Sequence, residues 1–124
     1  MPKSDVTAPS EAEVLRQCLD LLTLLRVKHY RNNTGAVAVA ATATSRRRYV
    51  RFGVPGMPDV VAVGPRGGRH AGKFIGIEVK APGGRLRPEQ AAVIDNLRAD
   101  EALAFVVRSA AELHEALTKE GVIP

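Results

Sequence analysis

Apolar residues recur at helical spacing near the start of the chain. The stripe consists of Val14, Leu15, Cys18, Leu22 and Leu25. Ser10, followed three residues later by Glu13, has the pattern of a capping box, in which two side chains satisfy backbone N–H groups at the start of a helix. These features predict a helix that begins at Ser10 and runs to about Lys28, whereas residues 1–8 are expected to form a disordered start.

The following segment predicts β-structure, weakly at first and then clearly. Residues 36–41 and 49–52 are candidate strands, which a hairpin over 42–48 would join. The apolar run 60–63 predicts a short buried strand, and residues 74–81 predict another. Because a loop rich in Gly and Pro separates these last two segments, we expect them to pair as an antiparallel hairpin.

The remainder of the chain alternates helix and strand. Pro88 suits the first turn of a helix that ends near Asp100, and residues 103–107 predict a buried strand. Ser109 can cap a last helix that stops at Gly121. The order of helix, two or three strands, helix, strand and helix predicts one α/β domain over residues 9–124, with a mixed central β-sheet flanked by helices.

Composition narrows the class of protein. A chain of 124 residues with 45% apolar and 25% charged residues has the composition of one globular domain. Its single cysteine, Cys18, is expected in the core, and Cys and His residues do not cluster. A catalytic metal would therefore need oxygen ligands. The sequence shows neither a secretory signal nor a run of about 20 apolar residues, which predicts an intracellular protein without a membrane span.

The net charge of +5 is unevenly distributed. No Asp or Glu occurs between Asp20 and Asp59. The basic residues of this stretch are Arg26, Lys28, Arg31, Arg46, Arg47, Arg48 and Arg51. A segment with one sign of charge attracts polyanions through phosphate contacts and counterion release. The alternative is a solvated arginine face that keeps the protein soluble.

The strand predicted at 74–81 carries two ionic residues on one face. Side chains alternate along a strand, so Ile75, Ile77 and Val79 face one side while Glu78 and Lys80 share the other. Buried ions are costly unless they are paired or bind a metal. Asp59 precedes the neighbouring strand and can add a second carboxylate if the hairpin register places both acids on one face. The alternative is a plain ion pair on the strand surface.

Such a group of residues suits hydrolysis of a phosphodiester. Two carboxylates and a backbone carbonyl form an oxygen-rich site of the kind that Mg²⁺ occupies. A bound metal lowers the pKa of a water and polarises the phosphate, while Lys80 can orient that water or stabilise developing charge.

Five elements, taken in order, resemble the virus-type replication-repair nuclease (VRR-NUC) family, a branch of the PD-(D/E)XK superfamily. They are Glu11 with Val14, Arg31-Asn32-Asn33-Thr34-Gly35, Gly53-Val54-Pro55-Gly56-Met57-Pro58-Asp59, Ile77-Glu78-Val79-Lys80, and Arg85-Leu86-Arg87-Pro88-Glu89-Gln90. The resemblance covers roughly residues 10–110 and implies a core similar to that of restriction endonucleases. Arg87 departs from the family, which often has Ser or Thr there, and this weakens the expected helix cap.

The resemblance implies roles for the site residues. Asp59, Glu78 and the carbonyl of Val79 would bind Mg²⁺ or Mn²⁺, and Lys80 would act on the attacking water. Glu11 would complete the acidic cluster.

Two further assignments stay open at this point. Glu11 lies on the apolar stripe of its helix, as an acid that points toward the sheet should, and Glu13 is the alternative. Gln90 would support the site or touch the scissile phosphate, and its alternative is a simple residue of the helix start.

The resemblance also implies a substrate. It predicts a structure-selective endonuclease that cuts branched DNA such as four-way junctions or flaps, acts as a homodimer and is encoded by a bacterium or phage. A non-catalytic DNA-binding module is the alternative. The residues expected to contact DNA are Arg31, Asn33, Arg46, Arg47, Arg48, Arg51 and Arg85. The glycine-rich segment 64–68 lacks the Lys-Ser/Thr of a phosphate loop and is interpreted as a turn whose Arg66, with Arg69, touches DNA.

Overall fold

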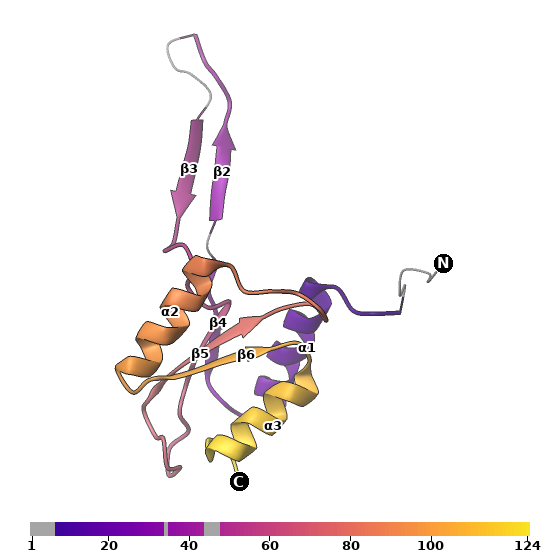
Figure 1. Ribbon diagram of the computed structural model, residues 1–124, viewed down its shortest axis with the longest axis vertical. Helices are drawn as coiled ribbons and strands as arrows, with labels where there is room; N and C mark the ends of the chain where they lie inside the picture. The colour runs from indigo at the N-terminus through magenta and orange to yellow at the C-terminus, as the bar shows by residue number, and fades with distance from the viewer. Residues whose placement is uncertain (1–6, 34, 44–47) are drawn as a thin grey trace.

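A computed structural model describes residues 7–33, 35–43 and 48–124, with the backbone alone for 35–39 and 48–52. Figure 1 shows the order of the elements along the chain. They are α1 Glu11–Leu24, β1 His29–Arg31, β2 Gly35–Val39, β3 Arg48–Phe52, β4 Val60–Val63, β5 Phe74–Val79, α2 Pro88–Ala99, β6 Leu103–Val107 and α3 Ala110–Glu120. The predicted α/β class is confirmed.

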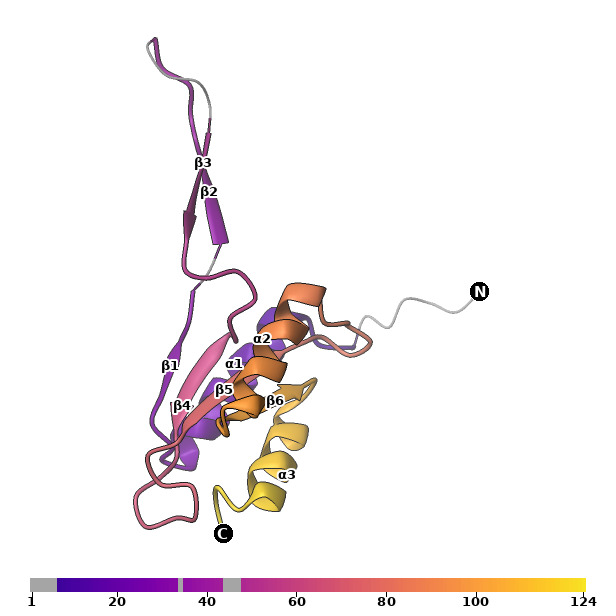
Figure 2. The same ribbon diagram turned by 60° about the vertical axis from the view of Figure 1, so that its left-hand side comes forward.

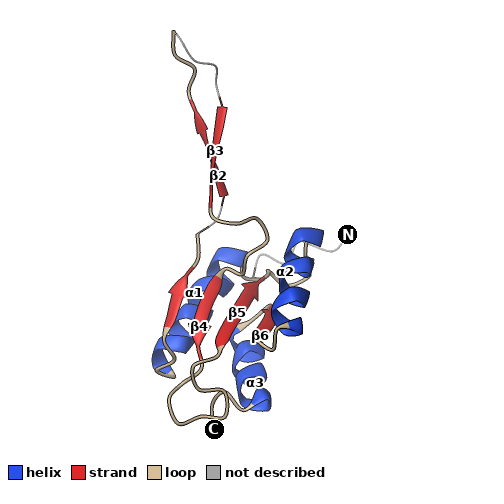
Figure 3. Ribbon diagram, turned by 90° about the vertical axis from the view of Figure 1, so that its left-hand side faces the viewer, coloured by secondary structure: helices blue, strands red, loops and turns tan. Residues whose placement is uncertain are grey.

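The central sheet has the strand order β1-β4-β5-β6 (Figure 3). β4 and β5 pair antiparallel, as predicted, with Val60 opposite Ile77 and Val63 opposite Phe74. β1 also pairs antiparallel with β4, whereas β6 runs parallel to β5. The sheet is therefore mixed, and β5 is one of its two inner strands.

Helices cover both faces of this sheet. One face packs α1 and α3 against Ile75, Ile77 and Val79 of β5, with Cys18 in the core as expected. Because side chains alternate, Gly76 and Glu78 face the opposite side, where Leu97 of α2 contacts the Gly76 position. Both faces of β5 are buried in consequence, which explains its nearly continuous burial.

β2 and β3 lie outside the central sheet. They pair with each other antiparallel, with Gly35 opposite Phe52, and project from the body as an arm (Figure 2). The candidate strands 36–41 and 49–52 correspond to β2 and β3, but the first ends at Val39. The prediction of two or three strands before α2 was wrong, because five precede it within the described residues, including the short edge strand β1.

The first helix ends earlier than the apolar stripe predicted. α1 stops at Leu24 rather than near Lys28. Arg26 has a φ of 57°, and the N–H of Val27 donates to the carbonyl of Leu22 at 3.0 Å, which is the bond pattern of a Schellman motif. Val27 is buried even though it lies past the helix, so the stripe continues through the turn.

The predicted start signals are confirmed. Ser10 and Ser109 are N-caps whose hydroxyls accept from the N–H groups of Glu13 and Glu112. Of the expected disordered start, residues 1–6 lie outside the described residues, and Thr7 is exposed. No helix in the described ranges is long and apolar enough to cross a bilayer.

Candidate active site

Pro58 and Gly76 set the distance between the segment before β4 and strand β5. A Cβ atom added at Gly76 would lie 2.8 Å from Cγ of Pro58 and 3.2 Å from Cδ1 of Leu97. Only glycine lets the proline ring pack this closely on the strand. The space beside Gly76 is thus filled by Pro58 and Leu97, and Asp59 follows directly after this contact.

Asn32 ties the same segment to the end of β1. Its side-chain amide donates to the carbonyl of Pro58 at 3.1 Å, and its backbone N–H donates to the carbonyl of Asp59 at 2.7 Å. The sequence placed Asn32 inside a family motif without giving it a role. The available signal was a side-chain amide directly after an edge strand. Its acceptor, the carbonyl of Pro58, lies 26 residues away in the sequence, so a local pattern does not reveal the contact.

The register of β4 and β5 brings the two acids together. Val60 lies opposite Ile77, so the preceding residue, Asp59, comes opposite Glu78. Directly opposed residues of an antiparallel pair project on the same face. Oδ2 of Asp59 also accepts a 2.8 Å hydrogen bond from the N–H of Val79. The register that the sequence left open therefore places both carboxyl groups at one end of the sheet.

Glu78 is buried between β5 and α2, with 1% of its surface exposed. The side-chain amide of Gln90 donates to its Oε1 at 3.0 Å, while Oε1 of Gln90 accepts from the N–H of Arg87 at 2.9 Å. Gln90 thus holds Glu78 with one end of its amide and supplies half of a capping box with the other. The Arg87 side chain has no hydrogen-bond acceptor, so it cannot form the second bond of a capping box.

The second oxygen of Glu78, Oε2, is buried without a hydrogen-bond partner among the described residues. Burial first, and then a hydrogen bond and repulsion from Asp59, raise the pKa of the Glu78 carboxyl to about 8, while the Lys80 ammonium acts in the opposite direction. The two acids can hydrogen bond only when one of them carries the proton. Loss of that proton leaves two adjacent carboxylates, whose repulsion a neighbouring cation reduces.

Lys80 lies between two carboxylates. Its Nζ is 4.0 Å from Oε1 of Glu78 and 3.9 Å from Oε1 of Glu11, and the residue is 8% exposed. Glu11 is therefore the acid of the first helix turn that faces the site, whereas exposed Glu13 contributes its backbone N–H to the Ser10 cap. The structure brings Glu11 to the lysine.

The donor set fits a hard divalent cation. Asp59 and Glu78 supply carboxylate oxygens from opposed positions, and the orphaned Oε2 of Glu78 is a buried acceptor that a cation would satisfy. Across the described ranges, no group of three or more His, Cys, Asp or Glu side chains is arranged to hold a metal. A metal here would therefore rest on two carboxylates, with backbone carbonyl and water oxygens as its other ligands.

An open cavity of about 350 Å³ lies beside this site. It is lined by Glu11, Ala12, Leu15, Arg16, Leu19, Arg31, Asp59 and Val79. Arg31 is exposed at the end of β1 and shares the lining of this cavity with Asp59. The structure therefore brings this predicted DNA contact near Asp59. Arg16 was not singled out from the sequence, because its position on α1 gave no sign of this neighbourhood.

Two other predicted DNA contacts, Asn33 and Arg85, do not line this cavity. Asn33 and Arg85 are exposed. Arg46 and Arg47 fall outside the described residues, and Arg48 and Arg51 belong to β3, whose side chains are not described.

Comparison with known proteins gives a family. The model of the VRR-NUC domain matches residues 10–111. Searches of curated proteins and of solved structures found no significant match. The matched residues include α1, the central sheet and α2, and thus every side chain of the site described above. The chain therefore belongs to the VRR-NUC domain family of nucleases, which have the PD-(D/E)XK fold and act on DNA.

Proposed function

We propose that the chain is a metal-dependent, structure-selective endodeoxyribonuclease that hydrolyses phosphodiester bonds in branched DNA such as four-way junctions or flaps. The observation that carries the hydrolytic part is the position of Asp59, just before β4, opposite Glu78 of β5, with Lys80 at 4.0 Å from Glu78. A DNA-binding module without catalysis would not need two acids held together at the cost of burial.

The carboxylates of Asp59 and Glu78 and the carbonyl of Val79 are the groups that would hold Mg²⁺ or Mn²⁺. When bound, such an ion supplies Lewis acidity and an activated water. Asp59 is oriented for this task by the N–H of Val79, and Glu78 by the amide of Gln90. The ammonium of Lys80 is placed to orient a nucleophilic water or to stabilise charge that develops on the phosphate.

Glu11 completes the proposed acidic cluster. Its carboxylate lies 3.9 Å from the Lys80 ammonium, and this ion pair keeps the lysine near the paired acids. Since 56% of the Glu11 side chain is exposed, its carboxylate can also accept hydrogen bonds from water at the mouth of the cavity.

Preference for branched DNA is proposed together with a homodimer. A single domain has one such site, yet symmetrical cutting of a four-way junction needs two, and twofold assembly is the commonest way to provide them. The β2–β3 arm supports this, because an isolated two-stranded hairpin is marginally stable without a partner surface. Light scattering behind size exclusion, at micromolar concentration without DNA, tests the dimer. The mass of one chain would contradict it.

The function is tested by incubating the protein with labelled four-way junction, flap and linear duplex DNA, with and without Mg²⁺ or Mn²⁺. We expect cleavage of the branched substrates that requires the metal and leaves the duplex intact. Equal cleavage of the duplex would contradict structure selectivity. Binding of branched DNA without cleavage under any metal would favour the non-catalytic module.

A further inference from the structure

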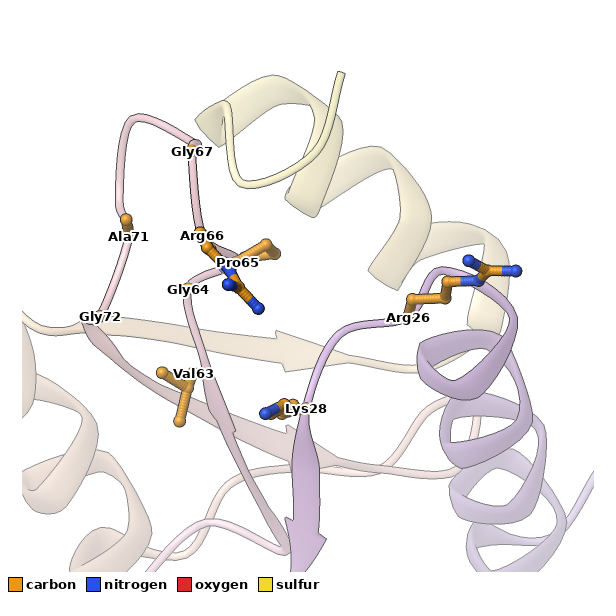
Figure 4. Close-up of a pocket in the computed structure, with 9 residues that line it drawn as sticks. All are labelled: Arg26, Lys28, Val63, Gly64, Pro65, Arg66, Gly67, Ala71 and Gly72. Atoms are coloured by element: carbon orange, nitrogen blue, oxygen red, sulfur yellow. The ribbon is translucent and has the colours of Figure 1, made fainter.

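A second cavity, of about 690 Å³, lies at the opposite end of β4 from the paired acids. Asp59 precedes this strand, whereas Val63 ends it and lines the second cavity (Figure 4). Its lining includes Arg26, Lys28, Val63, Gly64, Arg66 and Gly72. This described lining holds three cations and no acid.

Lys28 and Arg66 extend toward the same space from opposite sides of the cavity, while Arg26 extends away from it (Figure 4). In the part of the chain that the structure describes, neither Lys28 nor Arg66 has a carboxylate within salt-bridge distance. Two like charges that face one space without a counter-ion raise the local potential. The cavity is therefore suited to an anion.

Hydrogen bonds fix the backbone at Lys28 and in the loop that carries Arg66. The N–H of Val63 donates to the carbonyl of Lys28 at 3.0 Å, and the N–H of Gly72 closes the loop on the carbonyl of Gly64 at 3.0 Å. Buried His70 joins the same loop to α3 through a 2.9 Å hydrogen bond between its Nε2 and the carbonyl of Glu120. Ordering these cations on a bound anion would consequently cost little backbone entropy.

Basic residues stand at the two ends of the edge strand β1, which runs between this cavity and the paired acids. Arg26 and Lys28 also line a neighbouring cavity that includes Tyr30, and the next residue, Arg31, lines the cavity at Asp59. Lys28 and Arg31 are three positions apart, which is about 10 Å along an extended chain. In duplex DNA that length corresponds to roughly three base-pair steps.

We propose that the cavity at Lys28 and Arg66 binds backbone phosphates of the DNA arm whose scissile phosphate lies at Asp59 and Glu78. The inference rests on the proposed function in taking DNA as the ligand. The described lining offers no aromatic ring for a base and no carboxylate for a ribose hydroxyl, so only phosphate oxygens match its chemistry. The site adds affinity and fixes the direction of the arm without reading sequence.

The test compares wild type with Lys28→Gln/Arg66→Gln in binding a labelled duplex of two helical turns without divalent metal, over a salt series. Both side chains are exposed, so the fold should be retained, which circular dichroism checks. The matched control is the double variant Lys73→Gln/Lys119→Gln, which loses the same two positive charges. Both residues are exposed, and Lys119 lies on α3 outside the cavity. We expect the log-log salt slope to fall by about 1.8 in the cavity variant alone, because each phosphate contact contributes about 0.9.

An unchanged slope, or an equal fall in the matched control, would overturn the proposal. A second arm adds inorganic phosphate at constant ionic strength. Stabilisation of wild type by phosphate, absent from the cavity variant and accompanied by an unchanged DNA slope, would identify a site for free anions and would also overturn it. Neither the salt slope nor the stabilisation by phosphate requires DNA cleavage. Failure of this proposal can therefore be distinguished from failure of the proposed nuclease function.

Discussion

Gln90 of α2 donates a 3.0 Å hydrogen bond to Oε1 of Glu78, across the interface between helix and strand. Both residues are buried, so this bond selects one rotamer of a carboxylate whose other oxygen has no partner among the described residues. We therefore propose that Gln90 is a positioning residue, which acts through Glu78.

Replacing Gln90 with Ala should reduce both cleavage and metal affinity by roughly 10-fold to 100-fold, as removal of a partner that orients a metal ligand commonly does. Titration calorimetry with Mn²⁺ and single-turnover cleavage measure the two effects. Glu89→Ala, which removes an exposed neighbour paired with Arg87, is the control. Normal metal affinity in the Gln90 variant would show that the bond is only structural.

Asp59→Ala or Glu78→Ala should abolish cleavage and leave DNA binding largely intact, because basic residues rather than carboxylates hold phosphates. Gel-shift assays and cleavage of the same labelled junction separate the two properties. Glu13→Ala, which removes an exposed acid of α1, is the control. Cleavage at the wild-type rate in both variants would remove these acids from the site.

Without metal, the free energy of unfolding should fall as the pH rises from 4.5 to about 8, the ordinary and folded-state pKa values of Glu78. In this window the folded protein keeps a proton that the unfolded chain releases, so stability declines with pH. The loss is on the order of a few kcal/mol, since one pKa unit corresponds to about 1.4 kcal/mol.

Urea unfolding at several pH values measures this slope. Glu78→Gln should flatten it and make the protein more stable above pH 8, because the amide keeps a hydrogen-bonding partner without a charge. Glu115→Gln, which removes an exposed carboxyl on α3, is the charge-matched control. A slope that survives in Glu78→Gln would assign it to other groups.

Gly56→Ala should destabilise the protein and displace the start of α2. Gly56 has a φ of 86°, and a Cβ atom there would collide with the carbonyl oxygen of Glu89. Gly67 has a similar φ of 81° but no atom within 4 Å of such a Cβ, so Gly67→Ala reports the backbone strain alone. We expect Gly56→Ala to cost about 1–3 kcal/mol more than Gly67→Ala in chemical unfolding. Equal costs would argue against the close contact.

Replacing Arg46, Arg47 and Arg48 together with Ala should weaken DNA binding for all sequences and lower the salt slope by roughly one unit for each lost phosphate contact. This prediction rests on the basic sequence, since Arg46 and Arg47 lie outside the described residues. The same positions changed to Lys keep the charge and should retain most of the slope. An unaltered slope in the Ala variant would show that the segment does not contact DNA.

The sequence by itself determined the features that depend on short-range rules. Alternation was enough to predict that Glu78 of β5 and Lys80, which directly follows that strand, share one face, because the side-chain period is set by the backbone. The caps at Ser10 and Ser109 were equally readable, since hydroxyl and backbone partner lie three residues apart. The end of α1 was misjudged because Arg26 adopts a positive φ that usually favours glycine.

The tertiary structure alone decided which groups meet. Asp59 faces Glu78 because Pro58 packs on Gly76 and Asn32 holds the segment, and these contacts join residues far apart in the sequence. Gln90 reaches Glu78, and Lys28 faces Arg66, only after a helix and a loop have been placed against the sheet. Periodicity specifies the direction of a side chain within its own element, whereas its partners depend on long-range packing that a local pattern does not encode.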